Sequence, residues 1–345
     1  MSFFTESRLR LVEFNLENLF VFLDHYKGQD LDRVTEREWQ GFSSSTTPNK
    51  PLKQVRELAR AIADLDPDIL MLCEVGGLES LANFSKYFLS DRYAPHLLEG
   101  NSDRGIDIGY LVRRALPFTY DLISHKHRPL DFLYPHERQT ILNGFDHLRS
   151  AKVDSHKFSR DVLELRVFDV DPTEPALIIL LVHLKSQLDR SRIDPGGRDR
   201  RKAELDKLVK IQKEIEDEFE GRVPVVLTGD FNGSASRPEP EVEFETIYRD
   251  SKLEDALEWA KQPADERFTY MQLSNSRTRP GRNKQLDYVF LPPALGARVN
   301  EKETWVYRFK DDFGMTMIVP RNFNEKKLLP SDHYPVVVTL DPAKR

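Results

Sequence analysis

The chain has 345 residues, a formal net charge of −6, 39% hydrophobic and 31% charged residues, and one cysteine, Cys73. The acidic excess does not suit a passive nucleic-acid binder, and a lone cysteine excludes an internal disulfide. No apolar run approaches the length of a membrane span and no signal peptide is evident at the start, so we expect a cytoplasmic protein.

The first predicted strand covers residues 9–15, where apolar and polar side chains alternate, and it ends at Asn15. An asparagine at this place is also a common turn former. Residues 24–50 are polar and rich in serine and threonine, which predicts a mobile insertion with a short helix near residues 35–39. Residues 51–64 carry apolar side chains at helical spacing after a proline and predict an amphipathic helix.

A continuous apolar run over residues 69–73 predicts a strand covered on both faces, with Glu74 at its end. A carboxylate in that position would be costly if it were buried without a partner. Either Glu74 emerges into solvent or a cation offsets the cost. A helix is predicted next, over residues 78–89.

The middle of the chain begins with a strand over residues 106–112 that contains Asp107, and residues 116–123 continue as β structure. Residues 125–158 show no periodicity, and we expect a surface loop there. The histidines of this stretch have no metal-ligand spacing: His125, His127, His136, His147 and His156.

An antiparallel hairpin is predicted from two strands, residues 162–170 and 176–184, joined by a proline-containing turn. His183 and Lys185 share a face at the end of its second strand. They could form an anion site, although a histidine at a strand end is often structural. A long charged helix over residues 198–220 follows.

The short apolar run 223–227 predicts a buried strand, after which Asp230 and Asn232 alternate with Phe231. Because residues i and i+2 of an extended chain point the same way, these two polar side chains should project together. Such a pair can hold a hard cation, a water molecule or an anionic oxygen. The same residues are also ordinary turn formers.

The last third of the chain contains an arginine-rich loop, residues 274–284, that leads into a strand over residues 285–291. The loop could grip a phosphate backbone or be a solvated surface loop. Asp287 lies inside the apolar strand and needs a partner. Asp332 and His333 directly precede the final strand, residues 334–340.

Strands recur along the whole chain with helices between them, which suggests two packed sheets with helices outside, in one domain. Acids, amides and histidines stand at the strand ends in a way that chance turns would not produce. They are Asn15, Glu74, His183, Asp230, Asn232, Asp287, Asp332 and His333.

These segments resemble the ordered motifs of the endonuclease/exonuclease/phosphatase superfamily, which includes deoxyribonuclease I-like and exonuclease III-like enzymes. The resemblance spans residues 9–340, and it is most specific at the Gly-Asp-Phe-Asn motif of residues 229–232 and the Ser-Asp-His motif of residues 331–333. Residues 104–107 and 183–186 look most like a bacterial nuclease-like branch. The resemblance implies an α+β fold, a four-layer α/β/β/α sandwich of two mainly antiparallel sheets flanked by helices. It also implies one catalytic domain over residues 1–345 with insertions near 24–50 and 125–158.

The resemblance further implies the roles of the site residues. Asn15, Glu74 and Asp332 would hold Mg²⁺ or Mn²⁺. The catalytic set would be His183, Asp230, Asn232, Asp287 and His333, with Asp287 holding His333 and with either Asp230 or His333 as the base. Candidate substrate contacts are Asp107, Lys185, Arg277, Arg279 and Arg282.

We therefore expect a divalent-metal-dependent phosphodiesterase that cleaves DNA or RNA, with no obligate protein partner. One alternative is a phosphatase or phospholipase C-like hydrolase of a lipid headgroup or a sugar or inositol phosphate, which the acidic net charge allows. Another is a binding module that kept the fold and lost catalysis, although the acids and both histidines are present. Cys73 departs from the family pattern, in which glutamine often precedes the metal-binding glutamate, and this puts a contact behind the metal in doubt.

Overall fold

A computed structural model describes residues 3–142, 155–189, 192–237, 239–274 and 281–343. It contains two six-stranded sheets and a small two-stranded one. The first sheet has the order β13-β14-β1-β2-β4-β3, with strands at Trp305–Val306, Val336–Leu340, Leu9–Leu19, Ile69–Val75, Asp107–Arg113 and Tyr93–His96. The second has the order β5-β6-β7-β8-β12-β9, with strands at Thr119–Ser124, Val162–Phe168, Leu177–His183, Val225–Asp230, Asp287–Leu291 and Glu254–Asp255. The small sheet pairs β10 (Tyr270–Gln272) with β11 (Arg282–Lys284).

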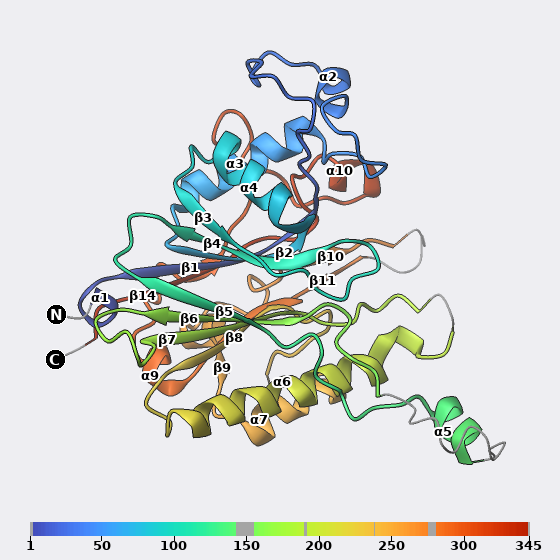
Figure 1. Ribbon diagram of the computed structural model, residues 1–345, viewed down its shortest axis with the longest axis vertical. Helices are drawn as coiled ribbons and strands as arrows, with labels where there is room; N and C mark the ends of the chain where they lie inside the picture. The colour runs from blue at the N-terminus through green and yellow to red at the C-terminus, as the bar shows by residue number, and fades with distance from the viewer. Residues whose placement is uncertain (1–2, 143–154, 190–191, 238, 275–280, 344–345) are drawn as a thin grey trace.

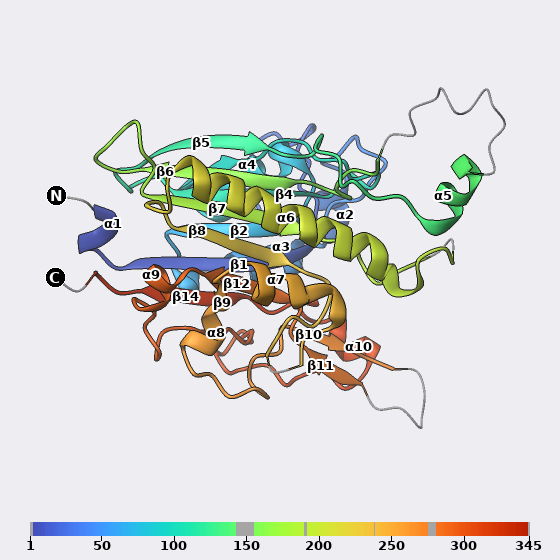
Figure 2. The same ribbon diagram turned by 90° about the horizontal axis from the view of Figure 1, so that it is seen from below.

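Helices cover the outer face of each large sheet. The helices α3 (Leu52–Leu65) and α4 (Gly77–Phe88) lie over the first sheet, and α6 (Arg198–Glu218) and α7 (Glu245–Asp250) lie over the second (Figures 1 and 2). The shorter helices are α1 (Phe3–Glu6), α2 (Glu36–Gln40), α5 (Pro135–Leu142), α8 (Ala256–Trp259), α9 (Pro293–Gly296) and α10 (Phe323–Lys326). This arrangement is the four-layer α/β/β/α sandwich predicted from the sequence. Within the described ranges, no helix is long and apolar enough to cross a membrane.

The inner faces of the two sheets form a continuous apolar core. Every residue of β7 is buried, as are the residues of β2 before Glu74, which explains why both segments appear in the sequence as uninterrupted apolar runs. Two polar contacts also join the sheets: the hydroxyl of Tyr110 lies 2.7 Å from the carbonyl oxygen of Leu163, and the Cys73 thiol donates to the carbonyl of Val182 at 3.4 Å. Cys73 is therefore part of the packing between the sheets.

Residues 24–50 contain the predicted short helix, as α2, and contact the body of the protein through a few buried side chains. Thr35 and Glu38 form a reciprocal capping box at the start of α2. The next turn carries Trp39, which is fully buried, and its indole N–H donates to the carbonyl of Lys50 at 2.8 Å. A large aromatic side chain thus anchors part of a stretch whose composition is typical of a loop.

The predicted loop over residues 125–158 is only partly described, and His147 lies outside the described residues. At its edges, two of its histidines are paired with carboxylates. His125 lies 2.8 Å from Glu164, and His156 lies 2.9 Å from Glu137. These pairs are local, and none of the predicted site residues takes part in them.

Strand pairing brings the predicted site residues to one edge of the sandwich. The parallel pair β1–β2 aligns Asn15 with Cys73, and the parallel pair β7–β8 aligns His183 with Asp230. The antiparallel pair β8–β12 then sets Asp287 opposite Asp230. Residues 47 to 58 positions apart in the chain therefore meet because of the strand register.

Gly229 fixes this register. Its φ is +131°, and a Cβ atom there would lie 1.9 Å from the carbonyl oxygen of Val182 on the neighbouring strand. We expect Gly229→Ala to lower the free energy of unfolding by at least about 3 kcal/mol, because backbone strain and a backbone clash add. Gly221→Ala is the control, since Gly221 has φ +71° and no atom within 4 Å of the added Cβ, and it should cost only about 1 kcal/mol. Urea unfolding of both variants checks this, and equal losses would contradict the clash.

Candidate active site

Asp230 lies at the centre of the candidate site. Its Oδ2 atom accepts a hydrogen bond from the side-chain amide of Asn15 at 3.0 Å. The same oxygen lies 3.6 Å from Nε2 of His183 and 4.0 Å from Nε2 of His333. Nitrogen donors from β1, β7 and the segment before β14 therefore converge on one carboxylate oxygen at the end of β8.

His333 is held by Asp287. Nδ1 of the imidazole lies 2.7 Å from Oδ2 and 3.0 Å from Oδ1 of the Asp287 carboxylate, and both residues are buried. The opposite ring nitrogen faces Asp230. This is the pairing that the family resemblance implies, and it gives the acid inside an apolar strand its partner.

The two histidines differ in charge. Burial works against a proton on His333, but the carboxylates of Asp287 and Asp230 outweigh it and raise its pKa well above the ordinary value. Burial lowers the pKa of His183 well below the ordinary value, and the positive charge of Arg160 adds to this. The local charges therefore favour the protonated imidazole at position 333, and burial favours the neutral imidazole at position 183.

The pKa of Asp230 is raised to about 7, first by burial and then by the negative charge of Asp287. A carboxyl group with such a pKa exchanges a proton near neutral pH, which suits a general base. The second oxygen, Oδ1, accepts from the backbone N–H of Asn232 at 2.8 Å. Asp230 is thus held at both oxygens.

Asn232 does not project beside Asp230 as strand alternation predicts. The strand ends at Asp230, and Asn232 has a left-handed backbone with φ of 55°. Its side-chain amide donates to the carbonyl of Leu184 at 3.0 Å. The turn interpretation of these residues therefore holds, and the turn is what fixes the carboxylate of Asp230.

A second set of carboxylates borders the site. The backbone N–H of Asn18 donates to Glu74 at 3.1 Å, and that of Asp332 donates to Glu17 at 3.0 Å. Glu17, Asn18 and Glu74 all have left-handed backbones, with φ between 48° and 60°. Strained non-glycine residues that gather in this way are typical of a functional site. The pKa of Glu17 is raised by burial and by the charge of Asp332.

Besides Glu17, two further residues of this region were not predicted from the sequence. Glu13 on β1 is fully buried, and neither of its carboxylate oxygens has a hydrogen-bond partner among the described residues. Burial, together with the negative charges of Asp287 and Asp230, raises its pKa well above the ordinary value. Lys50 is also buried, and its ammonium donates to the carbonyl of Glu17 at 2.8 Å.

The chemistry of these side chains fits a bound cation. Carboxylate and amide oxygens from Asn15, Glu74 and Asp332 are the donors that Mg²⁺ or Mn²⁺ prefers. Burial and then the crowding of acids raise the pKa of Glu17 and Asp230, and a cation would relieve the repulsion between these acids. Within the described ranges, the acids and histidines whose ligand atoms gather most closely are Asp230, Asp287 and His333, with these atoms within 4.8 Å of one another. This group could also hold a metal ion.

The candidate substrate contacts are dispersed. The ammonium of Lys185 donates to the backbone carbonyls of Ser186 and Leu188, so the strand face that it was expected to share with His183 is not formed. Arg282 is exposed on β11, and Asp107 is buried at the start of β4. Arg277 and Arg279 lie outside the described residues.

Comparison with known families gives one match over nearly the whole chain. The model of the Endonuclease/Exonuclease/phosphatase family matches residues 14–333. This range begins at the residue before Asn15 and ends at His333, so it contains every predicted metal and catalytic residue. No curated protein matches the sequence.

Solved structures with the same fold cover 97% of this chain. Truncated Caenorhabditis elegans TDP2 is 17% identical, with 98% of its own chain covered and a TM-score of 0.54. D. rerio TDP2, solved in complex with a single strand DNA product, is 15% identical, with 100% of its chain covered and a TM-score of 0.54. An endonuclease/exonuclease/phosphatase from Beutenbergia cavernae is 18% identical, with 72% of its chain covered and a TM-score of 0.53.

Proposed function

Since the chain belongs to the endonuclease/exonuclease/phosphatase family, whose members are generally hydrolases of phosphoesters, we propose that it is a divalent-metal-dependent phosphodiesterase that cleaves nucleic acid. One observation carries the proposal: Asp230, His183 and the Asp287–His333 pair converge at a strand edge, with an oxygen-rich rim beside them. Attack of water on phosphorus requires a base, which Asp230 can supply, and donors to the phosphoryl oxygens, which the two histidines can supply.

Each residue has a distinct task in this proposal. Asp230, with a pKa of about 7, orients the attacking water and takes its proton. The amide of Asn15 keeps the reacting oxygen of Asp230 in place. His333, as an imidazolium, donates from Nε2 to a phosphoryl oxygen, because Nδ1 is already engaged by Asp287. This division makes Asp230 the base and His333 the donor.

The neutral His183 supplies a second donor to the phosphoryl group, and Asn232 acts through its backbone N–H on Asp230. Glu74, Asn15 and Asp332 would hold Mg²⁺ or Mn²⁺. When bound, such an ion neutralises phosphoryl charge and stabilises the leaving oxygen.

Nucleic acid is the favoured substrate because single-stranded DNA is the product bound in the D. rerio TDP2 structure, whose fold this chain shares. The test is a panel of supercoiled DNA, single-stranded DNA, RNA, sphingomyelin and inositol phosphates, each with Mg²⁺ or EDTA. We expect Mg²⁺-dependent cleavage of a nucleic acid. Hydrolysis confined to sphingomyelin or an inositol phosphate would instead support the phosphatase or phospholipase C-like alternative.

The pH dependence of hydrolysis follows from Asp287. Its negative charge raises the pKa of both Asp230 and His333. Activity requires Asp230 without its proton, which sets the acid limb, and His333 with its proton, which sets the alkaline limb. Removing the charge in Asp287→Asn lowers both pKa values, so both limbs of the kcat/KM profile should move to lower pH. A profile that keeps its position or moves to higher pH would contradict the assigned roles.

A further inference from the structure

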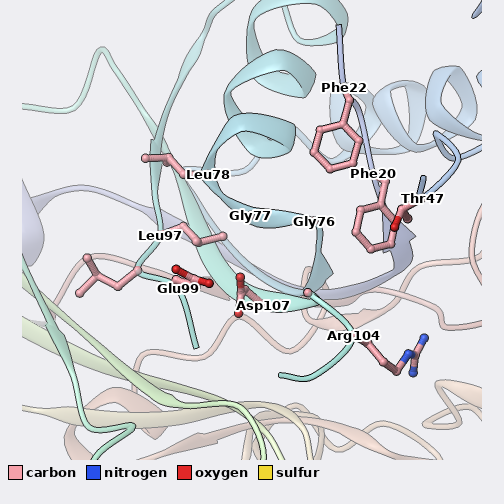
Figure 3. Close-up of a pocket in the computed structure, with 12 residues that line it drawn as sticks. Phe20, Phe22, Thr47, Gly76, Gly77, Leu78, Leu97, Glu99, Arg104 and Asp107 are labelled. Atoms are coloured by element: carbon pink, nitrogen blue, oxygen red, sulfur yellow. The ribbon is translucent and has the colours of Figure 1, made fainter. Parts of the chain in front are cut away.

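A pocket of about 520 Å³ opens beside the candidate active site. It lies between the start of α4 and the loop that precedes β4 (Figure 3). Its volume is within the range of sites for small organic ligands. The lining residues that matter here are Phe20, Phe22, Leu78, Glu99, Arg104 and Asp107.

Two hydrogen bonds connect the pocket to the site. Arg104 donates to the side-chain oxygen of Asn18 at 2.6 Å, and the backbone N–H of Asn18 donates to Glu74 at 3.1 Å. Gly76 and Gly77, which also line the pocket, follow Glu74 closely in the chain. A group seated in the pocket is therefore a close neighbour of a phosphate held at the site.

The aromatic and the acidic side chains that line the pocket lie on opposite sides of it. Figure 3 shows the rings of Phe20 and Phe22 on one side and the carboxylates of Glu99 and Asp107 on the other. The ring centroids are 5.9 Å apart. A Cβ atom on Gly76 would lie 2.2 Å from the Phe20 ring, so the glycine allows this ring to lie directly on the backbone.

This lining discriminates among ligands. An acyl chain would bury the carboxylates of Glu99 and Asp107 against hydrocarbon, which is costly. A second phosphate would meet the carboxyl groups of Glu99 and Asp107, and the guanidinium of Arg104 is already hydrogen-bonded to Asn18. The group that fits is flat, uncharged and rich in N–H donors, with faces that pack on phenyl rings and an edge that donates to carboxylates.

We propose that the pocket receives a nucleobase of an unpaired strand, next to the phosphodiester held at Asp230. This inference rests on the proposed function and narrows its substrate to single-stranded nucleic acid. Bases stack on aromatic side chains in such sites, whereas a base within a duplex has both its faces and its pairing edge occupied. Duplex DNA would first have to expel the base from its stack.

The test is binding of a short labelled oligonucleotide, measured by fluorescence anisotropy with Mg²⁺ in the Asp230→Ala background so that the strand stays intact. The strand is compared with one of equal length in which tetrahydrofuran replaces every base. We expect the base-bearing strand to bind more tightly. Phe22→Ala should weaken its binding about tenfold, and Leu78→Ala about threefold, with no change for the base-free strand. Phe313→Ala, which removes a phenyl ring that is 91% exposed elsewhere, is the control and should change neither.

Equal affinity for the two strands, or equal loss for both in Phe22→Ala, would overturn the pocket proposal. Hydrolysis of both strands by the parent protein without a base preference would overturn it as well and leave the phosphodiesterase proposal standing. A base preference in binding without any hydrolysis by the parent protein would support the pocket and contradict the phosphodiesterase proposal.

Discussion

Asp230→Ala is expected to lower kcat for phosphodiester hydrolysis at least about 1,000-fold, with a small change in KM. The carboxylate both orients the water and accepts its proton, and loss of a general base typically costs about 100- to 10,000-fold. The same side chain is the point on which Asn15, His183 and His333 converge, so its removal also loosens its neighbours. Steady-state kinetics on the preferred substrate of the panel measures this effect.

Asp230→Asn serves as the matched variant, since it keeps the shape of the side chain and removes its basicity. It should lose nearly as much activity as Asp230→Ala while keeping the melting temperature close to that of the parent. Full activity in either variant would refute the assignment of Asp230 as the base.

The second large effect is expected for His333→Ala, on stability as well as on rate. His333 and Asp287 form a buried charged pair at 2.7 Å, and removing one partner leaves the other unpaired. Such a loss typically costs about 3–5 kcal/mol. Urea unfolding should show this decrease, and hydrolysis should fall by at least about 100-fold because the phosphoryl donor is missing.

The double variant His333→Ala with Asp287→Ala separates the two effects. It removes the Asp287 carboxylate that His333→Ala leaves unpaired, so it should regain part of the stability lost in His333→Ala and none of the activity. If His333→Ala were as stable as the parent, the imidazolium–carboxylate pair would not be the contact that holds this edge of the sandwich.

Much of the candidate site could be predicted from the sequence because its residues lie at the ends of predicted strands. Asn15, Glu74 and Asp287 each follow or interrupt an apolar run, and a polar group in that position needs a reason. That argument predicts that Asp287 needs a partner, the family resemblance implies that the partner is His333, and the structure brings the two side chains together. The four-layer fold follows from the same apolar runs, because sheets covered on both faces need helices outside.

Other features of the site could not be predicted, because they depend on tertiary contacts that are not visible in the local sequence. Glu13 appears in the sequence as the polar position of an alternating strand, and only the second sheet makes it buried. Lys50 ends a polar stretch, and the burial of Trp39 is what brings it to Glu17. Asn232 left the predicted alternation because the strand stops at Asp230, and a two-residue pattern cannot say where a strand stops.

The central claim is tested most directly by hydrolysis of a single-stranded oligonucleotide, measured before Mg²⁺ is removed, after its removal and after it is restored. The parent protein is assayed with Mg²⁺, then after EDTA, then after Mg²⁺ is restored, beside Asp230→Asn at the same concentration. We predict that cleavage by the parent stops with EDTA and returns with Mg²⁺, and that Asp230→Asn stays inactive throughout. Cleavage that persists in EDTA, or equal cleavage by Asp230→Asn, would contradict a metal-dependent phosphodiesterase centred on Asp230.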